Sequence, residues 1–253
     1  NYNLFMDRFV IEGGKRLSGE VKISGAKNSA LPIIAASILT DKKVVLENIP
    51  DVVDIWTMLE LIRYLGAKVR FNRNTMEIHT PIIKRVDAPY DIVRKMRASY
   101  YVLGALIARE KKAKVSLPGG CAIGPRPIDL HIKGLKTLGS EIKIDDGYVN
   151  AYARNLKGRE IDLQGAKGSS VGATINVIFA ATQARGTTTI ISAACEPEVI
   201  DVVNFLNAMG ADITGAGTPT LVITGGKTLS GTTYKIIPDR IEAGTFAVAA
   251  AIT

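Results

Sequence analysis

Cys121 lies in a run that is rich in glycine and proline, Leu117–Asp129 (LPGGCAIGPRPID). A high density of these two residues is typical of a loop rather than of a helix or a strand. A thiol on a loop beside Arg126 has an exposed, electropositive setting, which favours the thiolate. Cys121 is therefore a candidate nucleophile or proton donor and acceptor. The alternative for a free cysteine is a small buried core residue.

Lys27 precedes a helical pattern, in the run Gly25–Ser29 (GAKNS). The amino end of a helix is already positive, so a lysine there is unfavourable unless it binds an anion together with the free backbone N–H groups. One interpretation of Lys27 is therefore an anion site, and the other is a solvated loop lysine. The GxxxxGK[ST] pattern of a Walker A loop is absent.

Further polar residues stand before two other helical patterns. Arg94, Lys95 and Arg97, together with Arg126, could make forked contacts to phosphate or carboxylate, and a solvated basic turn is the alternative. A weaker signal comes from two hydroxyl residues, Ser169 and Ser170. The two histidines, His79 and His131, stand too far apart and too unsupported to indicate a metal site.

An internal repeat of roughly 70 residues positions these candidates. Leu65–Val69, Leu138–Ile142 and Met209–Ile213 share a pattern in which a glycine follows an amphipathic run of helical period. Such a glycine is typical of a helix C-cap. The amphipathic runs are Trp56–Leu65, Ile128–Leu138 and Val199–Met209. A β-rich segment follows each of them, for example Lys68–Phe71 and Glu141–Ile144.

Upstream of each glycine, the sequence predicts a helix rich in small residues and then a strand. These pairs are Ala30–Leu39 with Val44–Leu46, Ala98–Ala108 with Ala113–Leu117, and Gly172–Ala184 with Thr187–Ile191. The small residues suggest that the three helices pack closely around a shared axis. Cys195 occupies the position in the next repeat that is equivalent to that of Cys121. It has no glycine-rich run and no arginine beside it, so we expect a structural role.

A fourth small-residue helix, Ala243–Thr253, is similar to the start of the third, Gly172–Ala181. No second half of a repeat follows it. Either the chain is incomplete, or this helix docks on the body of three repeats.

Composition narrows the class of protein. The 253 residues are 47% hydrophobic and 22% charged, which is ordinary for a globular protein. No apolar run is long enough for a membrane helix, no export signal is seen at the start, and two cysteines suit a reducing compartment, so we expect a cytoplasmic protein without membrane contact. The net charge of +8 favours anionic ligands. Scattered basic residues and 6% aromatics disfavour nucleic acid and leave phosphorylated metabolites.

Taken in order along the chain, the motifs resemble those of the UDP-N-acetylglucosamine 1-carboxyvinyltransferase family. The sister family, EPSP synthase, shares the fold, but the cysteine loop and the KNSALP run differ from it. The matching runs are Ser24–Pro32 (SGAKNSALP), Met96–Ser99 (MRAS), Pro118–Cys121 (PGGC), Arg126–His131 (RPIDLH), Ser170–Thr174 (SVGAT), Glu196–Glu198 (EPE) and Pro238–Glu242 (PDRIE).

The resemblance implies an α/β fold, an inside-out α/β barrel of repeated βαβαββ units. It also implies transfer of the enolpyruvyl group from phosphoenolpyruvate to the 3′-hydroxyl of UDP-N-acetylglucosamine, the first committed step of peptidoglycan synthesis. No cofactor and no metal are implied. Residues 25–237 would form a complete first domain of three units, and residues 1–24 and 238–253 would be parts of a second domain.

The same resemblance implies roles for individual residues. Cys121 would act as general acid toward the enolpyruvyl methylene and would be the target of fosfomycin, a covalent inhibitor. Lys27 and Arg126 would hold the phosphate of phosphoenolpyruvate, Arg97 would help to close the anionic site, and Asn28 would touch the sugar nucleotide. The remaining substrate-binding residues would be Pro127, Ile128, Asp129, Leu130, Lys167, Ser169, Ser170, Val171 and Gly172, beside Arg126.

Two departures from the family pattern affect these expectations. The lysine that the family has three places before the valine of SVGAT is Gly168 here, with Lys167 one step earlier. Family members are also longer, and their aspartate near the sugar 3′-hydroxyl and a further arginine have no counterpart in this chain. We therefore expect the 253-residue chain alone to bind the sugar nucleotide weakly and to turn over poorly or not at all.

Two alternatives stay open. An EPSP synthase-like enzyme would transfer the enolpyruvyl group to shikimate 3-phosphate and would be indifferent to fosfomycin. A non-catalytic fragment, including a nucleic-acid binder, would show no protection of Cys121 by phosphoenolpyruvate and would bind nucleic acid with a steep dependence on salt.

Overall fold

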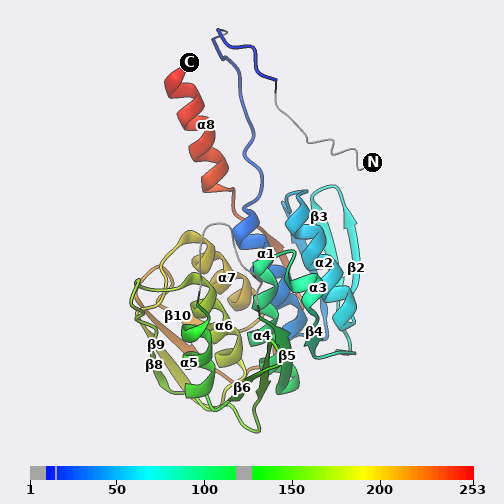
Figure 1. Ribbon diagram of the computed structural model, residues 1–253, viewed down its shortest axis with the longest axis vertical. Helices are drawn as coiled ribbons and strands as arrows, with labels where there is room; N and C mark the ends of the chain where they lie inside the picture. Colours follow the sequence, from blue (N-terminus) through cyan, green and yellow to red (C-terminus); the bar gives the residue numbers. More distant parts are fainter. Residues whose placement is uncertain (1–9, 15, 118–126) are drawn as a thin grey trace.

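Three four-stranded sheets with one strand order surround a set of buried helices (Figure 1). The computed structural model describes residues 10–14, 16–117 and 127–253. In each sheet the first strand of a unit pairs parallel with the second, the second pairs antiparallel with the fourth, and the fourth pairs antiparallel with the third. The expected repetition of βαβαββ units is therefore confirmed.

The elements divide among the three units as follows. The first has α1 (Lys27–Ala36), the 3-10 helix η1 (Ser37–Leu39), β1 (Lys43–Glu47), α2 (Val53–Leu65), β2 (Lys68–Asn72) and β3 (Thr75–His79). The second has β4 (Asp87–Ala88), α3 (Tyr90–Val93), the 3-10 helix η2 (Arg97–Tyr100), α4 (Tyr101–Glu110), β5 (Lys112–Ser116), α5 (Asp129–Thr137), β6 (Glu141–Asp145) and β7 (Tyr148–Tyr152). The third has β8 (Glu160–Asp162), α6 (Val171–Thr182), β9 (Thr187–Ile191), α7 (Pro197–Ala208), β10 (Asp212–Thr214) and β11 (Thr220–Thr224), and β12 (Thr233–Lys235) and α8 (Arg240–Ile252) follow it.

The repeat pattern in the sequence did not reveal the first strand of each unit. β4, β8 and β12 have two or three residues each, too few to show the alternation of a strand. β12 also lies far along the chain from its unit, since Val45 pairs with Thr233 beside β1. The end of the third unit thus completes the sheet of the first and closes the set of three.

Glycines end the second helix of every unit, as predicted. Gly66, Gly139 and Gly210 have φ angles of 119°, 103° and 101°, in the left-handed region that a C-cap needs. The small-residue helices start at slightly different places from those expected. α1 begins at Lys27, and the predicted helix Ala98–Ala108 is divided between η2 and α4.

The sheets present one face to solvent and the other to the helices. Buried and accessible residues alternate along β1, β3 and β9, the pattern of a sheet covered on one side. The helices α1, α4 and α6 are buried along most of their length. Helices inside and strands outside give the inside-out arrangement.

Helices α4 and α6 approach each other closely at Gly104. A Cβ placed on Gly104 would lie 2.4 Å from the backbone oxygen of Asn176 and 2.7 Å from its Oδ1. The backbone N–H of Gly104 donates to this Oδ1 at 2.6 Å. Close packing of the small-residue helices, expected from the sequence, is therefore confirmed for α4 and α6.

Helix α8 extends away from the three sheets, beside residues 16–24 (Figure 1). α8 has no buried residue. Docking of this helix on the three-unit body, one of the two alternatives for it, is therefore wrong. None of the helices in the described ranges combines the length and the hydropathy that crossing a bilayer requires.

Replacing Gly104 by alanine tests the α4–α6 contact. We expect Gly104→Ala to lower the free energy of unfolding by about 1–3 kcal/mol, because overpacking against a backbone oxygen outweighs the better helix propensity of alanine. Urea denaturation measures the effect. Gly244→Ala in α8 is the matched control, since no atom lies within 4 Å of its added Cβ. A Gly104→Ala chain as stable as this control would contradict the packing argument.

Candidate functional site

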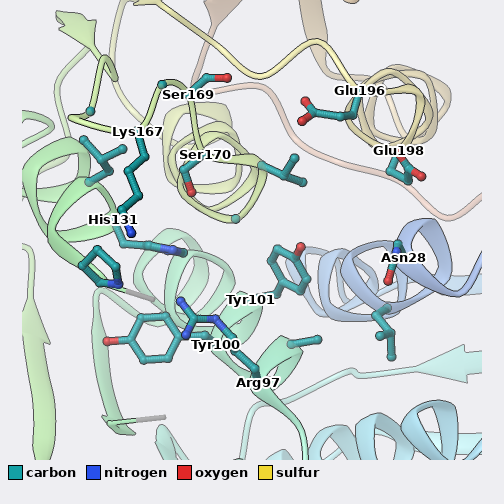
Figure 2. A pocket seen from close by; sticks show the side chains of 18 of the residues that line it. Asn28, Arg97, Tyr100, Tyr101, His131, Lys167, Ser169, Ser170, Glu196 and Glu198 are labelled. Atoms are coloured by element: carbon teal, nitrogen blue, oxygen red, sulfur yellow. The ribbon is translucent and has the colours of Figure 1, made fainter. Parts of the chain in front are cut away.

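A cavity of about 950 Å³ lies where many helices begin (Figure 2). Its wall includes residues from the first turns of α1, η2, α5, α6 and α7. Free backbone N–H groups and the positive ends of helix dipoles therefore converge on one space, which favours an anionic ligand. The volume is typical of small-molecule sites.

Most of the substrate-binding residues expected from the sequence line this cavity. They come from four separate stretches of chain, and the fold brings them together: Asn28, Arg97, Pro127, Asp129, Leu130, Lys167, Ser169, Ser170, Val171 and Gly172. Lys167 itself, despite the one-residue offset, is part of the wall. Two of the expected residues, Cys121 and Arg126, lie outside the described residues.

Lys27 and Ile128 do not belong to the wall of this cavity. Lys27 lines a smaller neighbouring hollow with Asp239 and Glu242 from the start of α8. Its Nζ pairs with Asp54 at 2.8 Å, and Asp54 lines both spaces. Ile128 is the residue before α5 and packs against the core instead.

Each second helix of a unit places an acidic residue of its first turn in the cavity wall. These residues are Asp54 of α2, Asp129 of α5 and Glu198 of α7. A carboxylate at a helix start is stabilised by the positive end of the helix. The threefold repeat of the units thus gives the cavity hydrogen-bond acceptors as well as donors.

Ion pairs within the described residues occupy some of the charges of the wall. Glu198, with a side chain 5% exposed, receives a forked contact from Arg240 at 2.9 and 3.3 Å. Lys95 pairs with Glu60 at 3.1 Å. Figure 2 shows Lys167 and Arg97 toward the side where His131 lies, and Glu196 and Glu198 toward the other side. Arg97 and Lys167 therefore lie at the His131 end of the wall, while Glu196 and Glu198, the latter paired with Arg240, lie at the other end.

The sequence reasoning did not assign roles to Tyr101 and His131. Tyr101 lies between these two ends in Figure 2. Burial first, and then nearby Glu198, raise the pKa of its hydroxyl to about 12, against a smaller opposite effect of Arg97. The phenol therefore stays a hydrogen-bond donor at neutral pH. The sequence did contain a signal for both residues. His131 directly follows Leu130, and Tyr101 comes four residues after Arg97, and both of these neighbours were expected to bind substrate.

His131 is 6% exposed and neutral. Burial first, and then Arg97, lower its pKa to about 4, against a smaller opposite effect of Asp129. Its ring meets Tyr100 edge to face at a centroid distance of 5.4 Å. It also lies against Gly172, where a Cβ would be 3.1 Å from Cε1. A side chain at this place in the first turn of α6 would therefore press against the imidazole ring.

Cys195 is an exposed free thiol, and its Sγ lies 3.5 Å from the backbone oxygen of Ala193. The expectation that this cysteine has a structural role in the packing is therefore wrong. It lies in the segment that connects β9 and α7, and no local sequence pattern indicates its exposure.

Comparisons with known proteins give one consistent result. The family model for EPSP synthase (3-phosphoshikimate 1-carboxyvinyltransferase) matches residues 11–253. A protein of Carboxydothermus hydrogenoformans named UDP-N-acetylglucosamine 1-carboxyvinyltransferase 2 is 54% identical over 98% of this chain and 58% of its own length. A Gluconobacter oxydans protein named UDP-N-acetylglucosamine 1-carboxyvinyltransferase is 56% identical over 98% of this chain and 59% of its own. The chain thus spans less than two thirds of these relatives.

Solved structures agree with the fold. The enolpyruvyl transferase NikO from Streptomyces tendae matches with a TM-score of 0.83 and 30% identity, over 94% of this chain and 56% of that one. An EPSP synthase from Acinetobacter baumannii matches with a TM-score of 0.77 and 22% identity, over 95% and 54%.

The lowered pKa of His131 predicts how stability depends on pH. The unfolded chain takes up a proton near pH 6.5, but the folded chain does so only near pH 4. The free energy of unfolding is therefore unaffected by this residue above pH 6.5. It falls by roughly 3 kcal/mol as the pH drops from 6.5 toward 4. Urea denaturation at several pH values should show a steeper loss for the unmodified chain than for His131→Gln.

The same change at the exposed His79 is the matched control for the substitution itself. Equal pH dependence of the unmodified and His131→Gln chains would show that the ring is not buried as a neutral group.

Proposed function

The chain belongs to the EPSP synthase family, and on that premise we propose that its protein is a UDP-N-acetylglucosamine 1-carboxyvinyltransferase. Such an enzyme transfers the enolpyruvyl group of phosphoenolpyruvate to the 3′-hydroxyl of the sugar nucleotide and releases phosphate. The relatives with 54% and 56% identity support this choice within the family. Because they are longer than this chain, catalysis is proposed for the whole protein and ligand binding for the part described.

The observation that carries the proposal is the mixed chemistry of the cavity. Helix starts, Arg97 and Lys167 suit the phosphates of a sugar nucleotide. The carboxylates of Asp129 and Glu196 suit its hydroxyl and amide donors, which a purely anionic ligand does not offer. A nucleoside diphosphate sugar has both kinds of group in one molecule.

The roles of the catalytic residues follow from the resemblance and the chemistry. Cys121 would deliver a proton to the methylene carbon of phosphoenolpyruvate while the sugar hydroxyl oxygen adds to the neighbouring carbon, which gives a tetrahedral ketal. The hydroxyl proton would pass to the aspartate that the family has near the sugar 3′-hydroxyl, in the part of the protein outside this chain. Loss of a proton and of phosphate from this ketal then forms the enolpyruvyl ether. Lys27 and Arg126 would hold the phosphate and neutralise its charge. Lys27 would then share its ammonium between the phosphate and Asp54.

We also propose that residues 25–237 form one domain and that residues 1–24 and 238–253 contribute to a second. The two connecting segments lie together at Gly25 and Pro238, and the N–H of Asp239 donates to the oxygen of Ser24 at 2.8 Å. Beyond this crossing, α8 exposes four large apolar side chains: Ile241, Phe246, Val248 and Ile252. A second domain would cover them.

The biological setting follows from the substrates. Sugar nucleotides and phosphoenolpyruvate are made in the cytoplasm, so we place the protein there. Its product would feed peptidoglycan synthesis and so cell-wall growth, cell shape and cell division.

Binding measurements test the proposed substrate. We expect the chain to bind UDP-N-acetylglucosamine more tightly than shikimate 3-phosphate in isothermal titration calorimetry. Arg97→Met should weaken this binding by about 10- to 100-fold, the range for losing a hydrogen bond to a charged group. Arg94→Met is the matched control, because Arg94 is exposed, pairs with Asp91 and is absent from the cavity wall. Tighter binding of shikimate 3-phosphate would favour the EPSP synthase-like alternative.

Fosfomycin tests the role of Cys121. We expect intact mass and peptide mapping to show one adduct, on Cys121, which forms faster with UDP-N-acetylglucosamine present. The exposed thiol of Cys195 is an internal control for non-selective alkylation. Equal labelling of both cysteines would count against a catalytic Cys121. A labelling rate that UDP-N-acetylglucosamine does not change would count against it as well.

A further inference from the structure

Asn176 is fully buried in the middle of α6, and backbone groups on both sides determine the orientation of its amide. Its Oδ1 accepts the N–H of Gly104 at 2.6 Å. Its Nδ2 lies 3.2 Å from the carbonyl oxygen of Tyr100 and 3.3 Å from that of Gly172. A backbone N–H can only donate and a carbonyl can only accept, so an exchange of the amide O and N would break all three contacts.

The amide orientation determines which nitrogen of His131 carries the proton. Nδ2 of Asn176 lies 3.0 Å from Nδ1 of His131, the shortest of its contacts. Nδ2 has two hydrogens for three neighbouring acceptors and no lone pair to offer, so a proton on Nδ1 would have no acceptor there and Nδ1 meets Nδ2 with its own lone pair. The single proton of the neutral ring is then on Nε2.

Every charged group near the ring is compatible with this neutral form. Arg97 of η2 disfavours a second proton, and Asp129 of α5 favours one less strongly. Figure 2 places Lys167, from the segment before α6, on the same side. Tyr100 contributes only an aromatic edge. Of the charged groups that act on the ring, the cation Arg97 therefore outweighs the carboxylate Asp129.

The Nε2 edge of the ring has no partner within the described part of the chain. His131 belongs to the cavity wall, and its Nε2 borders Gly172, where an added Cβ would lie 3.2 Å away. No hydrogen bond from Nε2 to a described residue is present. His131 is 6% exposed and lines the cavity, so a ligand oxygen in the cavity can accept from this edge.

We propose that Asn176 is a positioning residue, which holds His131 as the neutral Nε2–H tautomer so that the ring donates a hydrogen bond to an oxygen of the bound ligand. The proposal rests on the function proposed above and names the acceptor as an anionic oxygen of the sugar nucleotide, at the cavity end where Arg97 and Lys167 lie. His131 then binds substrate as an uncharged donor and takes no part in proton transfer. Asn176, which touches no ligand, acts only through it.

The tautomer is measured directly by ¹⁵N NMR of the imidazole in the full 253-residue chain. The chain has two histidines, so His79→Gln leaves His131 as the single ring signal. We expect a pyrrole-like signal for Nε2 and a pyridine-like signal for Nδ1 from pH 6 to pH 8. A protonated Nδ1, in either a neutral or a cationic ring, would overturn the inference without any ligand or variant of Asn176.

Substitutions separate positioning from packing. Asn176→Asp presents an acceptor to Nδ1, so it should move the pyrrole-like signal to Nδ1 and weaken binding of UDP-N-acetylglucosamine by about tenfold or more at pH 8. His131→Gln keeps an uncharged donor close to the Nε2 position and should bind within about threefold of the unmodified chain. His131→Leu removes the donor and should lose about 10- to 100-fold.

The outcomes distinguish this inference from the proposed function. An Nε2–H ring in a chain that binds no UDP-N-acetylglucosamine would refute the proposed substrate and the ligand contact, but would leave the positioning by Asn176 in place. If the His131→Gln and His131→Leu chains bind UDP-N-acetylglucosamine with equal affinity, the proposed hydrogen bond from Nε2 to the ligand is overturned. The proposed substrate would be unaffected by that result. Binding that shifts the Nε2 signal, with only His131→Leu and Asn176→Asp weakened, would support both.

Discussion

The close approach of α4 and α6 is the constraint on which the site depends. Gly104 has no room for a Cβ, because the backbone of Asn176 occupies that space. At this separation the side chain of Asn176 reaches the N–H of Gly104 and the ring of His131 at once. A wider spacing would leave a buried amide unsatisfied, which costs more than the hydrogen bonds contribute when made. Packing and the chemistry of the cavity are therefore coupled at one residue.

Three similar units with parallel helices bring many helix starts to one end of the body. The first-turn carboxylates of Asp54, Asp129 and Glu198 repeat there with the units, while cations and serines come from the small-residue helices and the segments before them. Helix dipoles then favour the phosphates of a ligand, and the carboxylates favour its neutral donors. The cavity is suited to a sugar nucleotide because of this combination rather than because of net positive charge.

Much of the fold could be predicted from local pattern. Helical periodicity, small residues and the glycines Gly66, Gly139 and Gly210 identify three repeats, since each signal depends on a few neighbouring residues. The short strands β4, β8 and β12 could not be found in this way. Their pairing is stabilised by partners elsewhere in the chain, above all for β12, which completes the sheet of the first unit. Most of the expected site residues line the cavity, but Ile128 and Lys27 do not, because one packs on the core and the other pairs beside it.

The sequence by itself determined the residue types at the helix starts, the repeat and the family resemblance, because these depend on order along the chain. Tertiary structure alone decided which of these residues meet. His131 and Asn176 are 45 residues apart, and nothing in either neighbourhood indicates that one orients the other. Cys195 shows the same limit, since its exposure follows from the path of the chain before α7. Contacts between distant segments arise from packing in three dimensions, and local patterns carry no record of them.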